Sequence, residues 1–159
     1  MILLPTQRTD SVSISSAATS YINGKHVYPT PVERMWFSAW LNEAYAEIVT
    51  TVRYTPQEVD PVQLKIRYEN TGDILVSTAH NNSPWLDKKE NIHFRAVHDW
   101  HHLQYNHAFD CAGEYMVFEA ASSLAPVQIH WILKSEIWLQ AAARHCLGRF
   151  PEQKLVRVA

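Results

Sequence analysis

The sequence predicts a mainly α-helical protein, a compact bundle of about four to five helices with an irregular N-terminal arm and at most one or two short strands. Helix-start signals recur along the chain, each a capping residue followed by a first-turn proline or acid. Apolar residues between these signals repeat at helical spacing. Only the short apolar stretch at residues 74–76 has the character of a strand.

The chain has 159 residues, which is long enough for one domain with a sizeable core and short for two. We expect a single helical domain over residues 30–150. Residues 1–29 are rich in Ser and Thr and have weak periodicity, so they are predicted to form an irregular arm with at most a short strand. Residues 151–159 are expected to form a C-terminal tail.

The first helix is predicted to begin after Thr30 and to run to about Thr50. Thr30, Pro31 and Glu33 supply an N-cap, a first-turn proline and a capping-box acid in the correct order. Apolar and aromatic residues then recur every three to four positions, so this helix is expected to bury a broad aromatic stripe. The stripe consists of Trp36, Phe37, Trp40, Leu41, Ala44, Tyr45 and Ile48.

Two proline-led helix starts follow, at Thr55 and Asp60, and a short helix is predicted to close near Gly72. Residues 74–76 are expected to form a short strand, and "HNNSPW" a turn-forming loop.

Asp87, with Glu90 three residues later, is a second capping box and predicts a helix over about residues 88–105. A break at residues 106–110 precedes another helix at about residues 111–124. Pro126 then opens a last long helix that ends before Gly148.

The charge balance argues against nucleic acid as a partner. The formal net charge is -2, the pI is near 6.5, and the lysines and arginines are scattered. Cys111 and Cys146 each lie in an apolar helical pattern, which is typical of buried thiols in a reducing compartment. No secretory signal or membrane span is recognisable, so a soluble, cytoplasmic protein is expected. The aromatic residues of the first helix leave a homodimer open.

Residues 93–107 contain five of the nine histidines of the chain. Because an α-helix advances 100° per residue, His98 and His102 lie on one face, with Asp99 beside both. Arg95 precedes Asp99 by four residues, which predicts that the two pair and that Asp99 stays ionised. A face that is this polar must either contact solvent or meet polar partners.

Glu114 and Glu136 are the predicted acidic partners. Glu114 lies early in the helix that follows, and Glu136 projects from the apolar stripe of the last helix. A carboxylate in such a position is costly unless a cation or a metal compensates it. Two histidines and one or two carboxylates form a mixed nitrogen and oxygen set suited to iron, manganese or zinc. We therefore expect His98, His102, Glu114 and Glu136 to hold a divalent metal ion.

These residues predict a metal-dependent hydrolase that acts on a small-molecule substrate. Its candidate catalytic residues are Arg95, Asp99, Glu114 and Glu136: either glutamate serves as a ligand or general base, and Arg95 orients Asp99 or an anionic substrate. Oxidation at a non-haem iron is the close variant. The alternative from another class is a structural or host-interaction module, in which the polar cluster is a buried network without catalysis. An ion pair between Glu136 and Arg95, and His80 as a further ligand, also remain open.

The same stretch resembles an uncharacterised family of phage and metagenomic open reading frames, over roughly residues 36–147. The shared pattern is FRAVHD, a histidine a few residues on, F, three residues, GE, and a later helix with a Glu and a Gln. The corresponding residues are Phe94 to Asp99, His102, Phe109, Gly113, Glu114, Glu136 and Gln140.

The resemblance implies that Arg95, His98, Asp99, Glu114 and Glu136 form one site. It also implies a viral or mobile-element origin, with action in the cytoplasm of the host cell. The family has a glycine before its second histidine, where this chain is one residue shorter. The family's second histidine therefore corresponds to His101 or His102.

Overall fold

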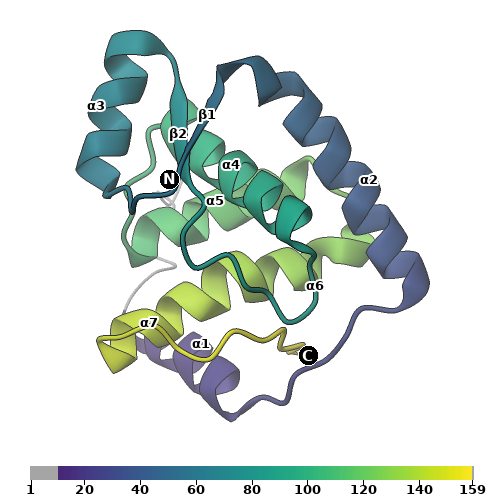
Figure 1. Ribbon diagram of the computed structural model, residues 1–159. Coiled ribbons are helices and arrows are strands. Elements are labelled where there is room, and N and C mark those ends of the chain that lie inside the picture. The colour runs from purple at the N-terminus through teal and green to yellow at the C-terminus, as the bar shows by residue number, and fades with distance from the viewer. Residues whose placement is uncertain (1–10, 159) are drawn as a thin grey trace, which may run out of the picture.

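Helices account for most of residues 11–158, the part of the chain that the computed structural model describes, and two short strands form the sheet found there (Figure 1). The predicted mainly α-helical fold class is confirmed. Side chains are described from residue 14 onward.

Helix α1 (Ser11–Asn23) occupies residues for which an irregular arm was predicted, so that prediction is wrong here. Residues 1–10 of the predicted arm lie outside the described residues. Ile14, Ala17, Ala18 and Tyr21 recur at helical spacing and pack into an apolar cluster with α7 (Gln140–Leu147), beside which α1 lies in Figure 1. The serines and threonines between these residues, together with the small alanines, give little contrast in hydrophobicity, so the helical periodicity is not evident in the sequence.

Helix α2 (Pro31–Ile48) begins with the predicted capping box, in which Thr30 accepts a hydrogen bond from the Glu33 N–H and Glu33 accepts one from the Thr30 N–H. The 3₁₀-helix η2 (Val49–Thr51) continues it. Phe37 and Trp40 are buried in the main apolar core. These two rings therefore stabilise the fold and are not available to form a dimer face.

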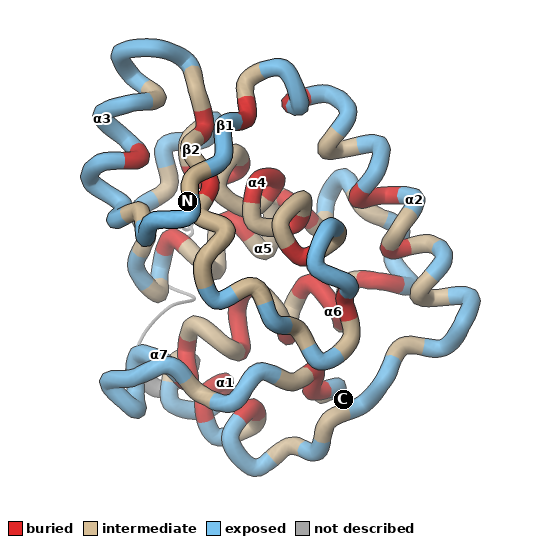
Figure 2. The backbone as a smooth tube through the Cα atoms, viewed as in Figure 1, coloured by how far each residue is buried: buried red, intermediate tan, exposed pale blue. Residues whose placement is uncertain are grey.

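Strands β1 (Val52–Thr55) and β2 (Ile74–Ser77) pair in parallel, with α3 (Pro61–Thr71) as the crossover between them. Thr55 was predicted to start a helix, but it ends β1, because its backbone is paired with Ser77 and its carbonyl accepts the Thr78 N–H. The predicted strand at residues 74–76 is confirmed by β2. Helix α3 is mostly exposed in Figure 2.

Helices α4 (Lys88–Gln104) and α5 (Cys111–Ser123) occupy the centre of the fold, and their bounds agree with the sequence prediction. Each begins at an aspartate, Asp87 or Asp110, whose side chain accepts a backbone N–H of the first turn. Helix α4 packs against α2 and β2 on one side and against α5 on the other.

The last helix is continuous but not uniform. It comprises η3 (Val127–Ile129), α6 (His130–Leu133), a π-helical segment η4 (Lys134–Leu139) and α7, which ends at Gly148. The prediction of one long helix before Gly148 is correct, but the π-helical segment was not predicted. Such segments are rare and occur frequently at functional sites. Glu136 lies within this one.

Residues 152–156 lie along residues 21–27, near α1 in Figure 1. Leu155 and Val156 are buried, and the Leu155 carbonyl accepts the Val27 N–H. Cys111 is partly buried, but Cys146 is exposed, so the prediction of two buried thiols is wrong for Cys146, which lies in the exposed last turn of α7. Within residues 11–158, no helix has both the length and the apolar character needed to span a bilayer.

Candidate metal centre

Two histidines of α4 and one glutamate of α5 converge where these helices meet. One ligand atom each from His98, His102 and Glu114 lies within 4.8 Å of the others. His98 Nε2 is 2.7 Å from Glu114 Oε2, His102 Nε2 is 3.1 Å from Glu114 Oε1, and the two Nε2 atoms are 3.2 Å apart. The helical spacing of His98 and His102 therefore does bring both rings to one acid, as the sequence predicted.

The His102 ring is held in place from its outer side. Its Nδ1–H donates to the carbonyl of His107 at 3.1 Å, and its face stacks on Phe109 with ring centroids 4.0 Å apart. Asn106 makes this possible because its left-handed φ of 52° turns the chain back after α4, a conformation that asparagine adopts more readily than most residues. With Nδ1 bonded to this carbonyl, Nε2 is directed to Glu114.

The His98 ring is oriented by the acid beside it. Asp99 Oδ1 lies 3.3 Å from His98 Nδ1, so Nε2 of His98 also faces Glu114. Each imidazole thus has an oxygen atom at Nδ1 and has Nε2 directed to the centre. This is how histidine ligands of metal ions are usually held. Asp99 therefore has a positioning role, and it does not face the centre itself.

The position of Glu114 depends on the glycine before it. A Cβ atom on Gly113 would lie 1.6 Å from the carbonyl oxygen of Ala108, so no other residue fits without moving the backbone. The Gly113 N–H also donates to the Asp110 cap at 2.8 Å. The loop between α4 and α5 is thereby fastened to the first turn of α5, from which Glu114 projects.

The electrostatics of the three residues are strongly coupled. Burial lowers the pKa of His98, but the charge of Glu114 and the hydrogen bonds to Asp99 and Glu114 raise it to about 10. Burial raises the pKa of Glu114, whereas the charge of His98 and the hydrogen bonds to both histidines lower it to about 2. Without a metal, His98 is therefore a cation paired with the Glu114 carboxylate. A metal ion that displaces the proton of His98 would meet the Glu114 carboxylate and the Nε2 atoms of both imidazoles.

Glu136 does not belong to this group of three. Its Oε1 accepts the indole N–H of Trp85 at 2.7 Å, and burial raises its pKa to about 7, although Trp85 and the charge of His98 lower it in part. Glu136 nevertheless lines the same pocket as His98 and Glu114. Its π-helical segment therefore presents a carboxyl group that is close to half-protonated at neutral pH next to the three candidate ligands.

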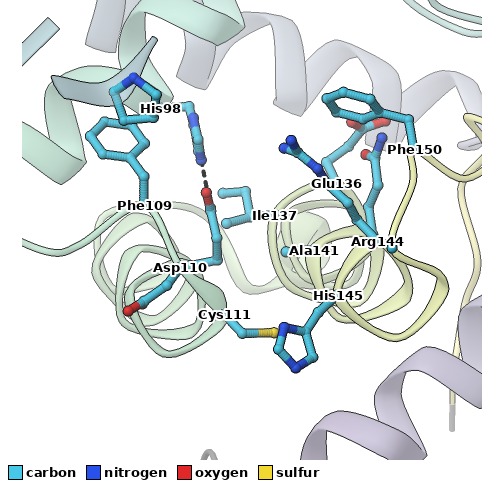
Figure 3. A pocket seen from close by; sticks show the side chains of 14 residues that line it. His98, Phe109, Asp110, Cys111, Glu136, Ile137, Ala141, Arg144, His145 and Phe150 are labelled. Atoms are coloured by element: carbon cyan, nitrogen blue, oxygen red, sulfur yellow. Dashed lines mark hydrogen bonds and ion pairs between the residues drawn. The ribbon is translucent and has the colours of Figure 1, made fainter. Parts of the chain in front are cut away.

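The pocket has a volume of about 600 Å³, within the range of small-molecule sites. Figure 3 shows His98 and Phe109 on one side and Glu136, Arg144 and Phe150 on the other. Polar or charged side chains make up half of the fourteen residues that line the pocket. The polar side chains are His98, Asp110, Glu114, Glu136, Gln140, Arg144 and His145.

Arg95 does not form the ion pair with Asp99 that the sequence predicted. Its guanidinium donates to the carbonyls of Ser77, Ala79 and His80, which ties α4 to the segment after β2. Among the described residues it forms no ion pair with Asp99 or Glu136, because those three carbonyls take up its donors. It does not line the pocket either.

The other histidines left open by the sequence lie outside the centre. His80 is exposed and contacts Glu58, with its Nε2 2.8 Å from Oε1. His101 is buried, its Nδ1–H donates to the Val97 carbonyl, and burial lowers its pKa to about 4. The histidine that accompanies His98 is therefore His102, not His101.

Two features of the site could have been found in the sequence. Residues 98–102 read H-D-x-x-H, which is the spacing of the helical H-E-x-x-H zinc motif with aspartate in place of glutamate. Gln140 and Arg144 follow Glu136 at intervals of four residues, the spacing that places residues on one helical face. No protein-family model matches the chain, and comparison with the curated proteins and with the solved structures finds no match.

Proposed function

We propose that the protein is a metal-dependent hydrolase of a small molecule, with one divalent ion bound by His98, His102 and Glu114. The observation that carries the proposal is the orientation of the two imidazoles. Both Nε2 atoms face Glu114, while an oxygen atom holds each Nδ1 from behind. Three protein ligands beside an open pocket is the arrangement of catalytic metal sites, which keep a position for water or substrate.

A divalent ion in this place would polarise a substrate oxygen and lower the pKa of water. Glu136 has the pKa that a general base needs near neutral pH, and it lines the same pocket. In the proposed reaction, Glu136 takes a proton from water as the water oxygen bonds to the electrophilic carbon or phosphorus. It then returns the proton to the leaving group as the bond to that group breaks. The net reaction is the addition of one water molecule across the bond.

Asp99 supports this chemistry as a positioning residue of His98. We assign no catalytic role to Arg95, because its guanidinium is used by three backbone carbonyls. Two histidines and one carboxylate also suit non-haem iron, but Glu136 favours hydrolysis because a carboxyl of pKa about 7 that is not one of the three candidate ligands is suited to proton transfer. Zinc, manganese and iron are all compatible with the ligands.

We further propose that the protein is related to the phage and metagenomic family and acts in the host-cell cytoplasm. The pattern of that family includes the glycine that Ala108 requires at residue 113, as well as Glu114, Glu136 and Gln140. Three of these residues line the pocket, which supports a shared site.

A non-catalytic module is the second candidate, and one observation favours it. Protonated His98 and Glu114 already satisfy each other as a buried ion pair, so the network can exist without a metal. In that case chelation leaves the melting temperature unchanged, and Glu136→Gln has no consequence for catalysis.

The test of the hydrolase is turnover by the metal-loaded full chain with chromogenic esters, amides and phosphate esters. We expect turnover of at least one class, lost on chelation, restored by metal, and reduced about 100-fold or more in Glu136→Gln. Glu47→Gln, on the exposed face of α2, serves as the matched control and should retain full activity. Equal rates for wild type and Glu136→Gln in every class would contradict the proposed function.

A further inference from the structure

We propose that the substrate carries an anionic group, a carboxylate or a phosphate, which Arg144 and Gln140 bind on the side of the pocket opposite the metal centre. The inference rests on the proposed function, because it assigns one end of the substrate to the metal and the other to Arg144. Figure 3 shows Arg144 and His98 on opposite sides of the pocket.

Arg144 has a free hydrogen-bonding edge. Among the described residues, its guanidinium contacts no carboxylate, and it stacks on the ring of Phe150, with Cζ 3.9 Å from the ring centroid. Stacking on an aromatic face fixes the plane of a guanidinium while its N–H groups remain available at the edge. A planar fork of donors held in this way suits bidentate binding of a carboxylate or phosphate.

The chain after α7 is shaped to provide this stacking. Gly148 adopts a left-handed φ of 69°, its N–H donates to the Arg144 carbonyl at 2.9 Å, and the chain then reverses. Phe150 returns to Arg144 although its side chain remains 69% exposed. Burial of apolar area therefore explains little of its position, and the contact with the guanidinium is its main interaction.

Gln140 adds a second donor on the same helical face. It lies one turn before Arg144 and one turn after Glu136, and all three line the pocket. Within the described part of the chain, its side chain makes no hydrogen bond, so its amide N–H groups are free to bind a ligand. Glu136, Gln140 and Arg144 thus offer an acid, an amide and a cation in sequence along one wall.

The proposed reaction takes place at the metal ion, so an anionic group elsewhere on the substrate needs a second positive position. Glu114 lies at the metal end, whereas Glu136 lies on the same side of the pocket as Arg144 in Figure 3. Arg144 provides the positive charge at the other side. The anionic group is therefore placed at Arg144 and the hydrolysable bond at the metal, with the apolar side chains of Phe109, Ile137 and Ala141 along the substrate between them.

Hydroxamates test the inference because they bind metal ions and can carry a second charge. The affinity of the zinc-loaded full chain would be measured by calorimetry for neutral acetohydroxamate and for dicarboxylic acid monohydroxamates of increasing chain length. We expect one chain length to bind about ten- to hundred-fold more tightly than acetohydroxamate, since a charged hydrogen-bonded pair contributes that much. The gain should vanish in Arg144→Gln and persist in Arg149→Gln, the matched exposed arginine nearby.

The outcomes separate this inference from the proposed function. If acetohydroxamate binds to the zinc-loaded protein but no carboxylate tail adds affinity, or if the gain survives Arg144→Gln, the anion site is wrong and the metal centre stands. If the protein takes up no zinc, manganese or iron, the proposed function fails and the anion site fails with it. Because Arg144 is exposed, circular dichroism should show an unchanged fold in Arg144→Gln.

Discussion

Two regions of the molecule bury polar groups in different ways. Where the terminal segments meet, the Tyr21 hydroxyl donates to the Glu152 carbonyl at 2.7 Å and accepts the Lys154 N–H at 3.1 Å. Ser135 Oγ accepts the Val156 N–H at 2.8 Å. We call this region the terminal clamp; it comprises α1, Ser135 and residues 152–158. Each of these contacts joins a neutral side chain to the backbone, and the sites are separate from one another.

The candidate metal centre has the opposite character. Its three side chains are ionisable, one ligand atom of each lies within 4.8 Å of the others, and two of them, His98 and Glu114, line a pocket. His102 is fully buried, while the side chains of His98 and Glu114 remain 21% and 16% exposed. Buried charges need mutual compensation to be tolerated, and they bring little net stability compared with apolar residues. The clamp therefore serves the fold, whereas the centre has an arrangement that the fold alone does not require.

The largest expected effect comes from Gly113→Ala. The added Cβ would overlap the Ala108 carbonyl, so the loop or the first turn of α5 must move, and we expect a loss of about 3 kcal/mol or more in unfolding free energy. Urea unfolding measures this loss. Gly72→Ala is the control, because Gly72 has a φ of 75° but open space around it, and should cost about 1 kcal/mol. Similar losses at both glycines would contradict the close approach at Gly113.

The next prediction concerns the pH dependence of stability in Glu136→Gln. The folded-state pKa of Glu136, about 7, lies above its ordinary value of 4.5, so the folded protein binds this proton more tightly than the unfolded chain. The contribution of this proton to the free energy of unfolding is complete below pH 4.5. It is lost as pH rises through 7, a loss of up to about 3 kcal/mol. In the presence of chelator, wild type should therefore lose unfolding free energy between pH 5 and pH 8 that Glu136→Gln keeps, so the variant becomes more stable relative to wild type.

Urea unfolding at both pH values measures this difference, with Glu47→Gln as the exposed control. If the unfolding free energies of wild type and Glu136→Gln change by the same amount between the two pH values, the carboxyl group is not buried as described.

The smallest effect is expected in the terminal clamp. Tyr21→Phe removes a buried hydroxyl and leaves the Lys154 N–H without it, which should lower the unfolding free energy by about 1 to 2 kcal/mol. Metal affinity should change less than about twofold, because the clamp contributes no side chain to the candidate ligands. Tyr28→Phe, at a tyrosine that is 65% exposed, is the control. A large change in metal affinity would contradict the separation of the two regions.

Much of the fold could be predicted because its signals are local. The capping box of α2, the aspartate caps of α3, α4 and α5, and the glycines after α3 and α7 mark helix ends through contacts over a few residues. Helix α1 was missed because alanine and serine carry little periodic contrast, and its helix is stabilised by tertiary packing on α7.

The candidate site was predictable only in part. The spacing of His98 and His102 follows from helical geometry, but the role of Glu114 depends on how α5 crosses α4. Arg95 was expected to pair within its helix, and instead it satisfies carbonyls of the chain after β2 that the sequence cannot place nearby. The π-helical segment at Glu136 likewise depends on tertiary packing, since no residue in it is a known signal for that geometry.

The most direct test is a zinc titration of the metal-free chain, produced without a histidine tag, by calorimetry and elemental analysis. We predict one ion per chain, a melting temperature that rises with zinc and falls on chelation, and at least about 100-fold weaker binding in His98→Ala/His102→Ala and in Glu114→Gln. His93→Ala, on the same helix but stacked on Tyr45, should bind like wild type. No bound metal and no effect of zinc on melting would contradict the account.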